Sequence, residues 1–227
     1  MLREQRIVLR LSGDRRLARA VLAQLPPRLR RDIGDDVAAH RGLARLTPPR
    51  PLSAFRVGPA EPAARLERWY REGQGRSGVP WQVLAAVNYV ESDFGRVRNA
   101  SVSGAQGPMQ FIPSTWRTYG RGDVHDPHQA ILAAARFLRA AGAPRDLRAA
   151  LYRYNPAPGY VDAIMRYARR IRRDRAAYLV YYARRLIVRT PSGYRRLTRA
   201  APFRDALTVA GRGSRRPLVI QTPPRRG

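Results

Sequence analysis

The sequence predicts an all-α protein, and three observations lead to that prediction. Apolar residues recur at helical spacing along most of the chain, and runs that alternate β-branched with polar residues are missing. The chain has 227 residues, 44% of them hydrophobic, and is long enough to bury a core. We therefore expect one helical domain with an extension at each end.

The first 50 residues are expected to form an N-terminal helical extension. Helical spacing of apolar residues predicts one helix over 14–25 and a second over 29–46. Pro26-Pro27 lies between them, and because proline interrupts a helix, the two should form a hairpin or a bent pair. Residues 51–60 are predicted to be a Pro-rich linker.

The main helical domain is predicted over residues 61–189. Its helices share apolar positions at helical spacing and are bounded by Pro, Gly or N-capping residues. They comprise residues 61–72, 81–91, 126–138 and 160–177, a helix that opens at Pro113 and one that ends near Tyr152.

The C-terminal part changes character. Residues 176–183 either lengthen the preceding helix or lead into a short strand with residues 186–188. Residues 190–227 are rich in Arg, Gly and Pro and are predicted to be a basic tail, partly disordered, with disorder from about Arg212.

Glu91 is the first candidate for chemistry because it closes the apolar helix. At about 100° per residue, Val87 and Leu84 lie within roughly 40° of its direction, so the carboxyl group should point toward the interior. Burial disfavours the charged form of a carboxyl group and raises its pKa. A carboxylic acid that stays protonated near neutral pH can act as the general acid in glycosidic-bond cleavage. The alternative is a Glu at a helix end whose charge reaches solvent.

A glycine-containing segment, residues 101–116, follows Glu91 about a dozen residues later. Gly104 and Gly107 permit positive φ or a close approach of the backbone to a ligand. Gln110 offers a hydrogen-bond donor and an acceptor, and Met109 and Trp116 offer apolar surface. Two glycines at this spacing also occur in tight turns between helices, so the segment gains weight from Glu91-Ser92 before it and Met109-Gln110 within it.

With these residues the chain resembles the soluble lytic transglycosylase family, whose fold is that of goose-type lysozyme. The matching residues are Glu91-Ser92, Gly104-x-x-Gly107-x-Met109-Gln110, Ala149 to Asn155, and Tyr160-Val161, within residues 62–175. The position two residues after Gln110, where the family often has methionine, is Ile112.

The resemblance implies a role for each matching position. Glu91 would be the single catalytic acid/base. Ser101 would help to orient the sugar or the glutamate, and the Gly107 segment with Met109 and Gln110 would line the saccharide groove. Tyr154, with Asn155 beside it, would place its hydroxyl near the catalytic carboxyl.

The family chemistry needs one carboxylate, whereas most glycosidases use two. The resemblance implies cleavage of the β-1,4 bond between N-acetylmuramic acid and N-acetylglucosamine, with formation of a 1,6-anhydro end. Asp93 is the nearest second carboxylate. It points away from Glu91 if the helix continues past Ser92, and the sequence does not place it if the helix stops there. Two alternatives are kept: a hydrolytic lysozyme of the same fold, and a non-catalytic module that binds wall glycan or an anionic polymer.

The charge balance is strongly basic. All 44 basic residues are Arg, and with 16 acidic residues the net charge is +28. Such a chain is attracted to anionic partners, so we expect wall polymers or anionic lipids to bind beside peptidoglycan strands. Nucleic acid is not expected, because charge is present without a reading motif. The arginines of Arg169-Arg170 and Arg172-Arg173 are expected to be solvated helix surface.

We expect neither a cofactor nor a metal. The chain has no cysteine, and His40, His125 and His128 do not have the spacing of metal ligands. The implied substrate predicts a location outside the cytoplasm. The first ten residues lack the apolar stretch of a signal peptide, so the chain would start further upstream or use another export route.

Overall fold

The computed structural model describes residues 2–197 and 207–208. The prediction of an all-α fold is confirmed, because the described residues are mostly helical. No helix in this part of the chain has the length and apolar character needed to cross a membrane. The disorder expected beyond Arg212 concerns positions outside the described residues. The divisions at residues 50, 60 and 189 stay predictions.

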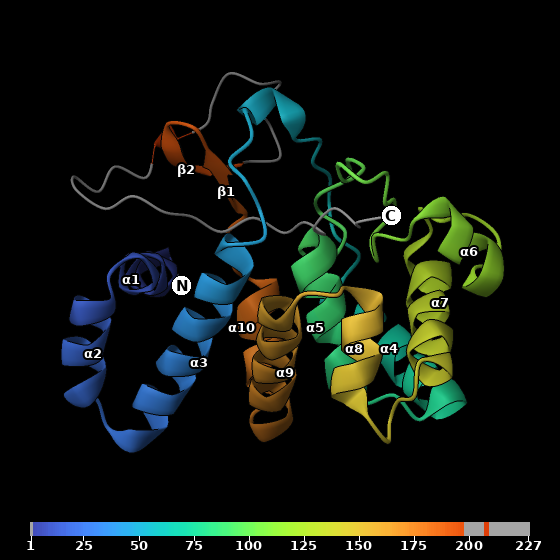
Figure 1. Cartoon of the computed structure of the whole chain (residues 1–227), viewed down its shortest axis with the longest axis horizontal. Helices are drawn as coiled ribbons and strands as arrows, with labels where there is room; N and C mark the ends of the chain where they lie inside the picture. The colour runs from blue at the N-terminus through green and yellow to red at the C-terminus, as the bar shows by residue number, and fades with distance from the viewer. Residues whose placement is uncertain (1, 198–206, 209–227) are drawn as a thin grey trace.

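The elements follow one another in the order of their labels in Figure 1. They are α1 (Leu2–Gly13), α2 (Arg15–Ala23), α3 (Pro27–Ala44), the 3-10 turn η1 (Leu52–Ala54), α4 (Ala63–Ser77), α5 (Trp81–Ser92), α6 (Pro113–Tyr119), α7 (Pro127–Ala140), α8 (Leu147–Tyr154), α9 (Pro158–Arg173), α10 (Ala176–Tyr182), β1 (Ile187–Thr190), β2 (Gly193–Arg196) and β3 (Leu207–Thr208).

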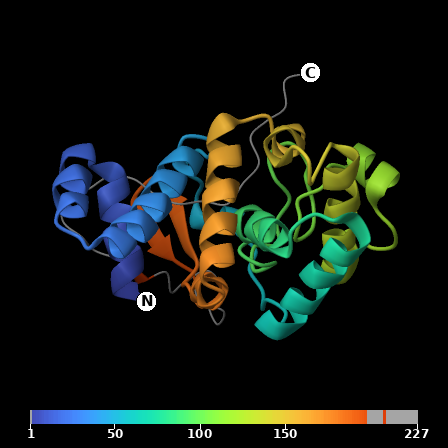
Figure 2. The same cartoon turned by 90° about the horizontal axis from the view of Figure 1, so that it is seen from below.

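Helix α9 is the central element of the molecule. In Figures 1 and 2 it stands between the N-terminal helices α1–α3 and the group formed by α4, α5 and α7. It packs against α3 on one side and α5 on the other. Its apolar side chains, among them Tyr160, Ile164 and Tyr167, are fully buried in the main core. The position of α9 therefore links the N-terminal extension to the helix that carries Glu91.

The N-terminal extension has its own small core. Val8 and Leu11 of α1 pack with Ala18 of α2 and Val37 of α3. Helix α1 was not predicted, whereas α2 and α3 match the predicted helices 14–25 and 29–46 closely. Asp14 caps α2 because its carboxylate accepts a hydrogen bond from the Leu17 N–H at 2.9 Å.

Ion pairs join α3 to α9. Asp35 accepts hydrogen bonds from Arg166 and Arg169 at 2.7 and 3.1 Å, and Arg173 reaches Asp32 at 2.8 Å. Arg169, Arg172 and Arg173 are exposed, as expected for solvated helix surface, although Arg169 and Arg173 also pair with α3. The expectation was wrong for Arg170, whose side chain is 14% exposed and pairs with the buried Asp36. A single sequence does not reveal that an acidic helix lies opposite.

A buried charge cluster extends this contact. The Asp36 carboxylate pairs with Arg184 and Arg170 at 2.5 Å and accepts a hydrogen bond from Tyr181 at 2.7 Å. Burial by itself raises the pKa of Asp36, but Arg184 and Arg170 outweigh it and hold that pKa below its usual value. Asp36 is thus an ionised partner that fastens α3 to the segments around α10.

The chain ends its helical part in a small antiparallel sheet. Helix α9 stops at Arg173, and the Asp174 carboxylate accepts a hydrogen bond from the Ala176 N–H at 2.9 Å, where the next helix begins. Of the two alternatives for residues 176–183, a separate helix that leads into a strand is the one found. β1 pairs with β2 from Ile187↔Arg196 to Thr190↔Gly193.

Candidate active site

Helix α5 carries Glu91 into the middle of the domain. Every residue of α5 except Gln82 is buried. The helix ends at Ser92 because Asp93, Phe94 and Gly95 take positive φ values of 51°, 62° and 82° in succession. This reversal turns the chain back under α5 and fixes the last helical turn, which contains Glu91.

The Glu91 carboxyl group is buried and hydrogen-bonded, as predicted from its place on the apolar face. Glu91 is 1% exposed. The hydroxyl of Tyr160, in the first turn of α9, donates to Oε1 of Glu91 at 2.7 Å. Burial and then the Glu91 charge raise the pKa of Tyr160 well above 10. Tyr160 therefore keeps its proton and acts as a donor to the carboxylate.

Tyr154 lies near Glu91, because burial and then the Glu91 charge raise its pKa well above the usual value. Its hydroxyl donates to the Met109 carbonyl at 2.6 Å, while Tyr160 supplies the hydrogen bond to Glu91 Oε1. The role of Tyr154 in the site stays a prediction. The two tyrosine rings lie parallel, with centroids 6.5 Å apart. Tyr154 thus ties the glycine-containing segment to α8 and stands behind the tyrosine that contacts the acid.

The segment after α5 is fastened to the Glu91 helix through one carbonyl group. Ser92 Oγ donates to the Pro108 carbonyl at 2.6 Å, and Asn88 Nδ2 donates to the same oxygen at 2.8 Å. Tyr70 in turn donates to Asn88 Oδ1 at 2.6 Å. Buried polar groups need hydrogen-bond partners, and this network provides them for the Asn88 amide, the Ser92 hydroxyl and the Pro108 carbonyl. The same bonds set the distance between Glu91 and the segment.

Gly107 is required by the geometry of this segment. Its φ is 73°, and a Cβ atom built on it would lie 2.0 Å from the Val124 carbonyl oxygen. The Gly107 carbonyl accepts hydrogen bonds from the backbone and side-chain nitrogens of Gln110 at 3.1 and 2.9 Å. Gln110 itself has a φ of 49°. The side chain of Gln110 is therefore held by the same turn that needs glycine at 107.

Ser101 and Met109 have structural contacts in the described residues. Ser101 Oγ accepts a hydrogen bond from the Ala105 N–H at 3.0 Å and lies 2.9 Å from Ser103 Oγ. The Met109 side chain is fully buried in the main core. Both residues shape the segment from within, and a direct role with a sugar stays a prediction for them.

Asn155 is the predicted site residue with unused hydrogen-bonding capacity. It is fully buried just after α8, yet neither Oδ1 nor Nδ2 has a hydrogen-bond partner within the described structure. A buried primary amide without partners is costly, so its retention is typical of a group that meets a ligand or water.

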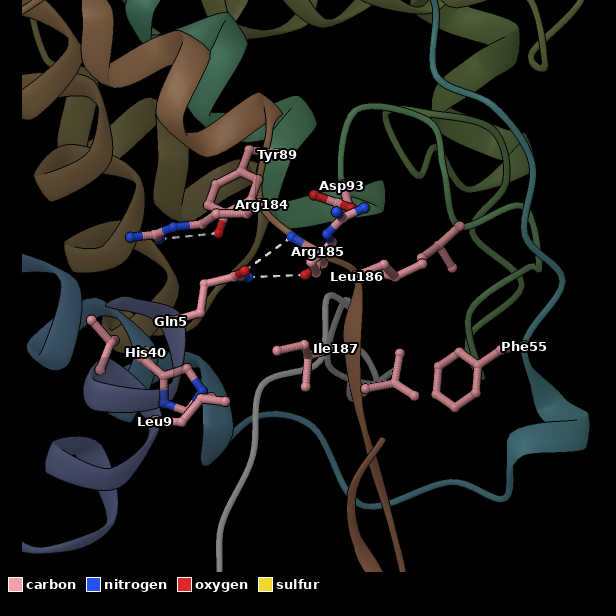
Figure 3. Close-up of a pocket in the computed structure, with 13 residues that line it drawn as sticks. Gln5, Leu9, His40, Phe55, Tyr89, Asp93, Arg184, Arg185, Leu186 and Ile187 are labelled. Carbon is pink, nitrogen blue, oxygen red and sulfur yellow. Dashed lines mark hydrogen bonds between the residues drawn. The ribbon is translucent and has the colours of Figure 1, made fainter. Parts of the chain in front are cut away.

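Asp93 lies apart from this arrangement. It forms an ion pair with Arg96 at 3.4 Å. It also lines a small pocket together with Tyr89, His40 and Ile187, and Glu91 does not line that pocket. Figure 3 shows Tyr89 and Asp93 on one side of that pocket and His40 and Leu9 on the other. The enclosed space is about 40 Å³, enough for water. Burial raises the pKa of Asp93 to about 7, against the opposing effect of Arg96.

A larger hollow lies beside the glycine-containing segment. Its volume is about 380 Å³, and its lining includes Gly95, Gly107, Pro108 and His125 but not Glu91.

His128 lies away from this hollow: it contacts Glu72 at 2.8 Å and stacks on Trp69. Among the described residues, no group of three or more His, Asp or Glu side chains is arranged to hold a metal ion.

Two residues of the site were given no role by the sequence. Tyr160 follows the Tyr154-Asn155 pair by a few residues, but only packing of α9 on α5 shows that it reaches Glu91. Asn88 is one helical turn before Ser92, and a polar amide on the Glu91 face of an otherwise apolar helix was the available signal.

Comparison with known proteins locates a family domain. Residues 69–175 match the model described as Transglycosylase SLT domain. A membrane-bound lytic murein transglycosylase F 1 of Alkalilimnicola ehrlichii is 30% identical over 124 residues, which are 51% of this chain and 25% of that protein. A membrane-bound lytic murein transglycosylase F of Thiobacillus denitrificans is 34% identical over 73 residues, 32% of this chain and 15% of that protein. The chain thus spans a quarter or less of these relatives.

Proposed function

Because this chain contains a transglycosylase SLT domain, we propose that it is a peptidoglycan lytic transglycosylase. One observation carries the proposal: the Glu91 carboxyl group is buried in the family domain and accepts a hydrogen bond from a protonated phenol at 2.7 Å. The relatives' names specify murein as their substrate, and the proposed substrate is accordingly the glycan strand of peptidoglycan.

Glu91 is proposed to act first as an acid and then as a base. Its proton passes to the bridging oxygen between N-acetylmuramic acid and N-acetylglucosamine, and the bond from that oxygen to the anomeric carbon breaks. The C6 hydroxyl oxygen of the muramoyl residue then bonds to the anomeric carbon. Its proton returns to Glu91, so the product has a 1,6-anhydro end and no water is consumed.

Tyr160 is proposed to hold the carboxylate during this cycle. A hydrogen bond to an ionised carboxylate stabilises the charged form, which exists between the two proton transfers. Asp93, the neighbouring carboxylate in the sequence, is paired with Arg96 and lines a different pocket, which favours a role for Glu91 alone.

Substrate binding is proposed to use the segment around Gly107 and the end of α8. Gln110 and Asn155 supply amide groups, while Ser101, Met109 and Tyr154 support them through the contacts described above. Because Glu91 is 1% exposed, a glycan can contact its carboxyl group only after the side chains that cover it move aside. Such a substrate implies that the protein works outside the cytoplasm.

The test is digestion of purified sacculi followed by mass spectrometry of the released muropeptides. We expect wild-type protein to release anhydro ends, which are lighter by one water than hydrolysed ends. Glu91→Gln should release none, and the matched control Asp93→Asn, two residues away, should release them at close to the wild-type rate. Hydrolysed ends would indicate a lysozyme, and release by Glu91→Gln would exclude Glu91 as the acid.

A further inference from the structure

A second hollow lies in the N-terminal extension, away from Glu91. Its volume is about 460 Å³, and it is formed where α1 ends, α2 begins, α3 ends and β1 passes. Four of its lining residues are arginines, namely Arg15, Arg41, Arg45 and Arg189. No Asp or Glu is among the residues that line it. The hollow is therefore polar and positively charged.

The carboxylates of the neighbouring helix face are already engaged. Asp32, Asp35 and Asp36 of α3 pair with arginines of α9 and with Arg184. The C-terminal end of the same helix carries Arg41 and Arg45 and has no such counterpart in the described chain. The carboxylates on one face of α3 are thus neutralised by arginines, whereas the positive charges at its C-terminal end are not paired with carboxylates of the described chain.

Two of the four arginines are fixed in place by neutral groups. Arg41 donates to the carbonyls of Leu11 and Ser12 at 3.0 and 3.2 Å. Arg189 donates to the Ala44 carbonyl at 3.3 Å. Carbonyl groups orient a guanidinium group without cancelling its charge, and each guanidinium has five N–H groups to offer. Both side chains are held while donors remain for a ligand.

The other two arginines, Arg15 and Arg45, are exposed, and their guanidinium groups form no hydrogen bond or ion pair with any described residue. The charges of Arg15 and Arg45 act on the neighbouring Arg41. Burial, and then repulsion from Arg15 and Arg45, lowers the pKa of Arg41. Crowded like charges of this kind are relieved by an anion.

His40 also lines the hollow. It is 1% exposed, and burial lowers its pKa to about 3, so its ring is neutral. Nε2 lies 3.5 Å from the Tyr194 hydroxyl, whereas Nδ1 is buried without a hydrogen-bond partner in the described structure. If Nε2 accepts from Tyr194, Nδ1 carries the ring proton and needs an acceptor.

We propose that this hollow, the arginine pocket, binds the phosphate group of a phosphate ester. Guanidinium groups match phosphate oxygens in pairs, and several of them around one hollow favour phosphate over a single carboxylate. The hollow has room for the phosphate together with its ester substituent. The pocket is separate from the glycan site, and the proposal does not depend on the activity proposed for Glu91.

The test compares two double variants that remove the same charge. Arg15→Gln/Arg45→Gln removes the two pocket arginines whose side chains make no hydrogen bond or ion pair with a described residue. Arg145→Gln/Arg153→Gln removes two exposed arginines outside the pocket. The probes are glycerol 1-phosphate, measured by calorimetry, and phosphatidylglycerol vesicles, measured by co-sedimentation against phosphatidylcholine vesicles. Thermal melting checks that both variants fold.

We expect the pocket variant to bind at least one probe about tenfold more weakly than wild type, and the control variant to bind within about twofold. Loss with the free ester identifies a soluble or polymer-borne phosphate, and loss with vesicles alone identifies a lipid headgroup. An equal loss in both variants would show attraction by net charge and overturn the proposal. So would the absence of binding of either probe to the wild-type protein.

Discussion

The backbones of Gly42 in α3 and Gly159 in α9 are in contact, and Gly159 is the residue directly before Tyr160. A Cβ atom built on Gly42 would lie 2.9 Å from the Gly159 carbonyl oxygen, and one built on Gly159 would lie 3.1 Å from the Gly42 oxygen. The N-terminal extension therefore abuts the helical turn that presents the tyrosine to Glu91. The extension and the candidate catalytic group are parts of one packed unit.

The first prediction follows from that contact. Gly42→Ala should destabilise the protein by about 1–3 kcal/mol, because backbone atoms must shift to admit the methyl group, and turnover should fall with it. The control is Gly34→Ala in the same helix, where the new Cβ would meet only Leu22 at 3.9 Å. Alanine there should stabilise by about 0.5–1 kcal/mol. Chemical denaturation measures both, and equal effects would contradict the predicted clash.

The second prediction separates the two tyrosines. Tyr160→Phe should lower kcat about tenfold, as expected for the loss of a hydrogen bond worth about 1.4 kcal/mol to a charged group, with little change in KM. Tyr154→Phe should also reduce turnover more than binding. The kinetics of sacculus digestion measure kcat and KM for both variants.

A Tyr160→Phe rate identical to that of wild type would mean that the hydrogen bond to Glu91 does not affect the reaction. An unchanged rate in Tyr154→Phe would remove Tyr154 from the candidate site. Its expected loss of stability, about 1–3 kcal/mol for an unsatisfied Met109 carbonyl, is a separate readout by thermal melting.

The third prediction concerns Asp93 and pH. Burial raises the pKa of this carboxyl group from 3.8 to about 7, so the folded state binds its proton more tightly than the unfolded state does. The contribution of Asp93 to stability is therefore greatest in acid and is lost as pH rises from about 4 to about 7. Asp93→Asn should be increasingly stabilised relative to wild type across that window, by up to about 4 kcal/mol. Denaturation at several pH values measures it, and a constant difference between the two proteins would refute it.

The fourth prediction tests the glycine-containing segment. Gly107→Ala places a methyl group 2.0 Å from the Val124 carbonyl oxygen and should abolish digestion of sacculi and lower the melting temperature. Gly104→Ala is the matched control, since Gly104 also has positive φ, at 79°, but its Cβ would meet open space. It should cost only about 1–2 kcal/mol of backbone strain. Full activity in Gly107→Ala would show that the turn can be rebuilt.

The sequence by itself determined the local features of this protein. Helical spacing identified most of the helices, and the apolar face of residues 81–90 placed Glu91 in the interior, where the structure has it. The motif residues pointed to the family whose domain model matches residues 69–175. These inferences succeed because they depend on periodicities and residue types within short stretches of chain.

Only the tertiary structure decided which distant groups meet. Tyr160 donates a hydrogen bond to Glu91 because α9 packs beside α5, and Arg170 is buried against Asp36 because α3 lies opposite α9. Asp93 faces a separate pocket because α5 ends in three residues of positive φ. The four arginines of the arginine pocket come from α2, from the C-terminal end of α3 and from β1. Contacts of this kind arise from the packing of whole elements, which the local pattern of a single chain does not encode.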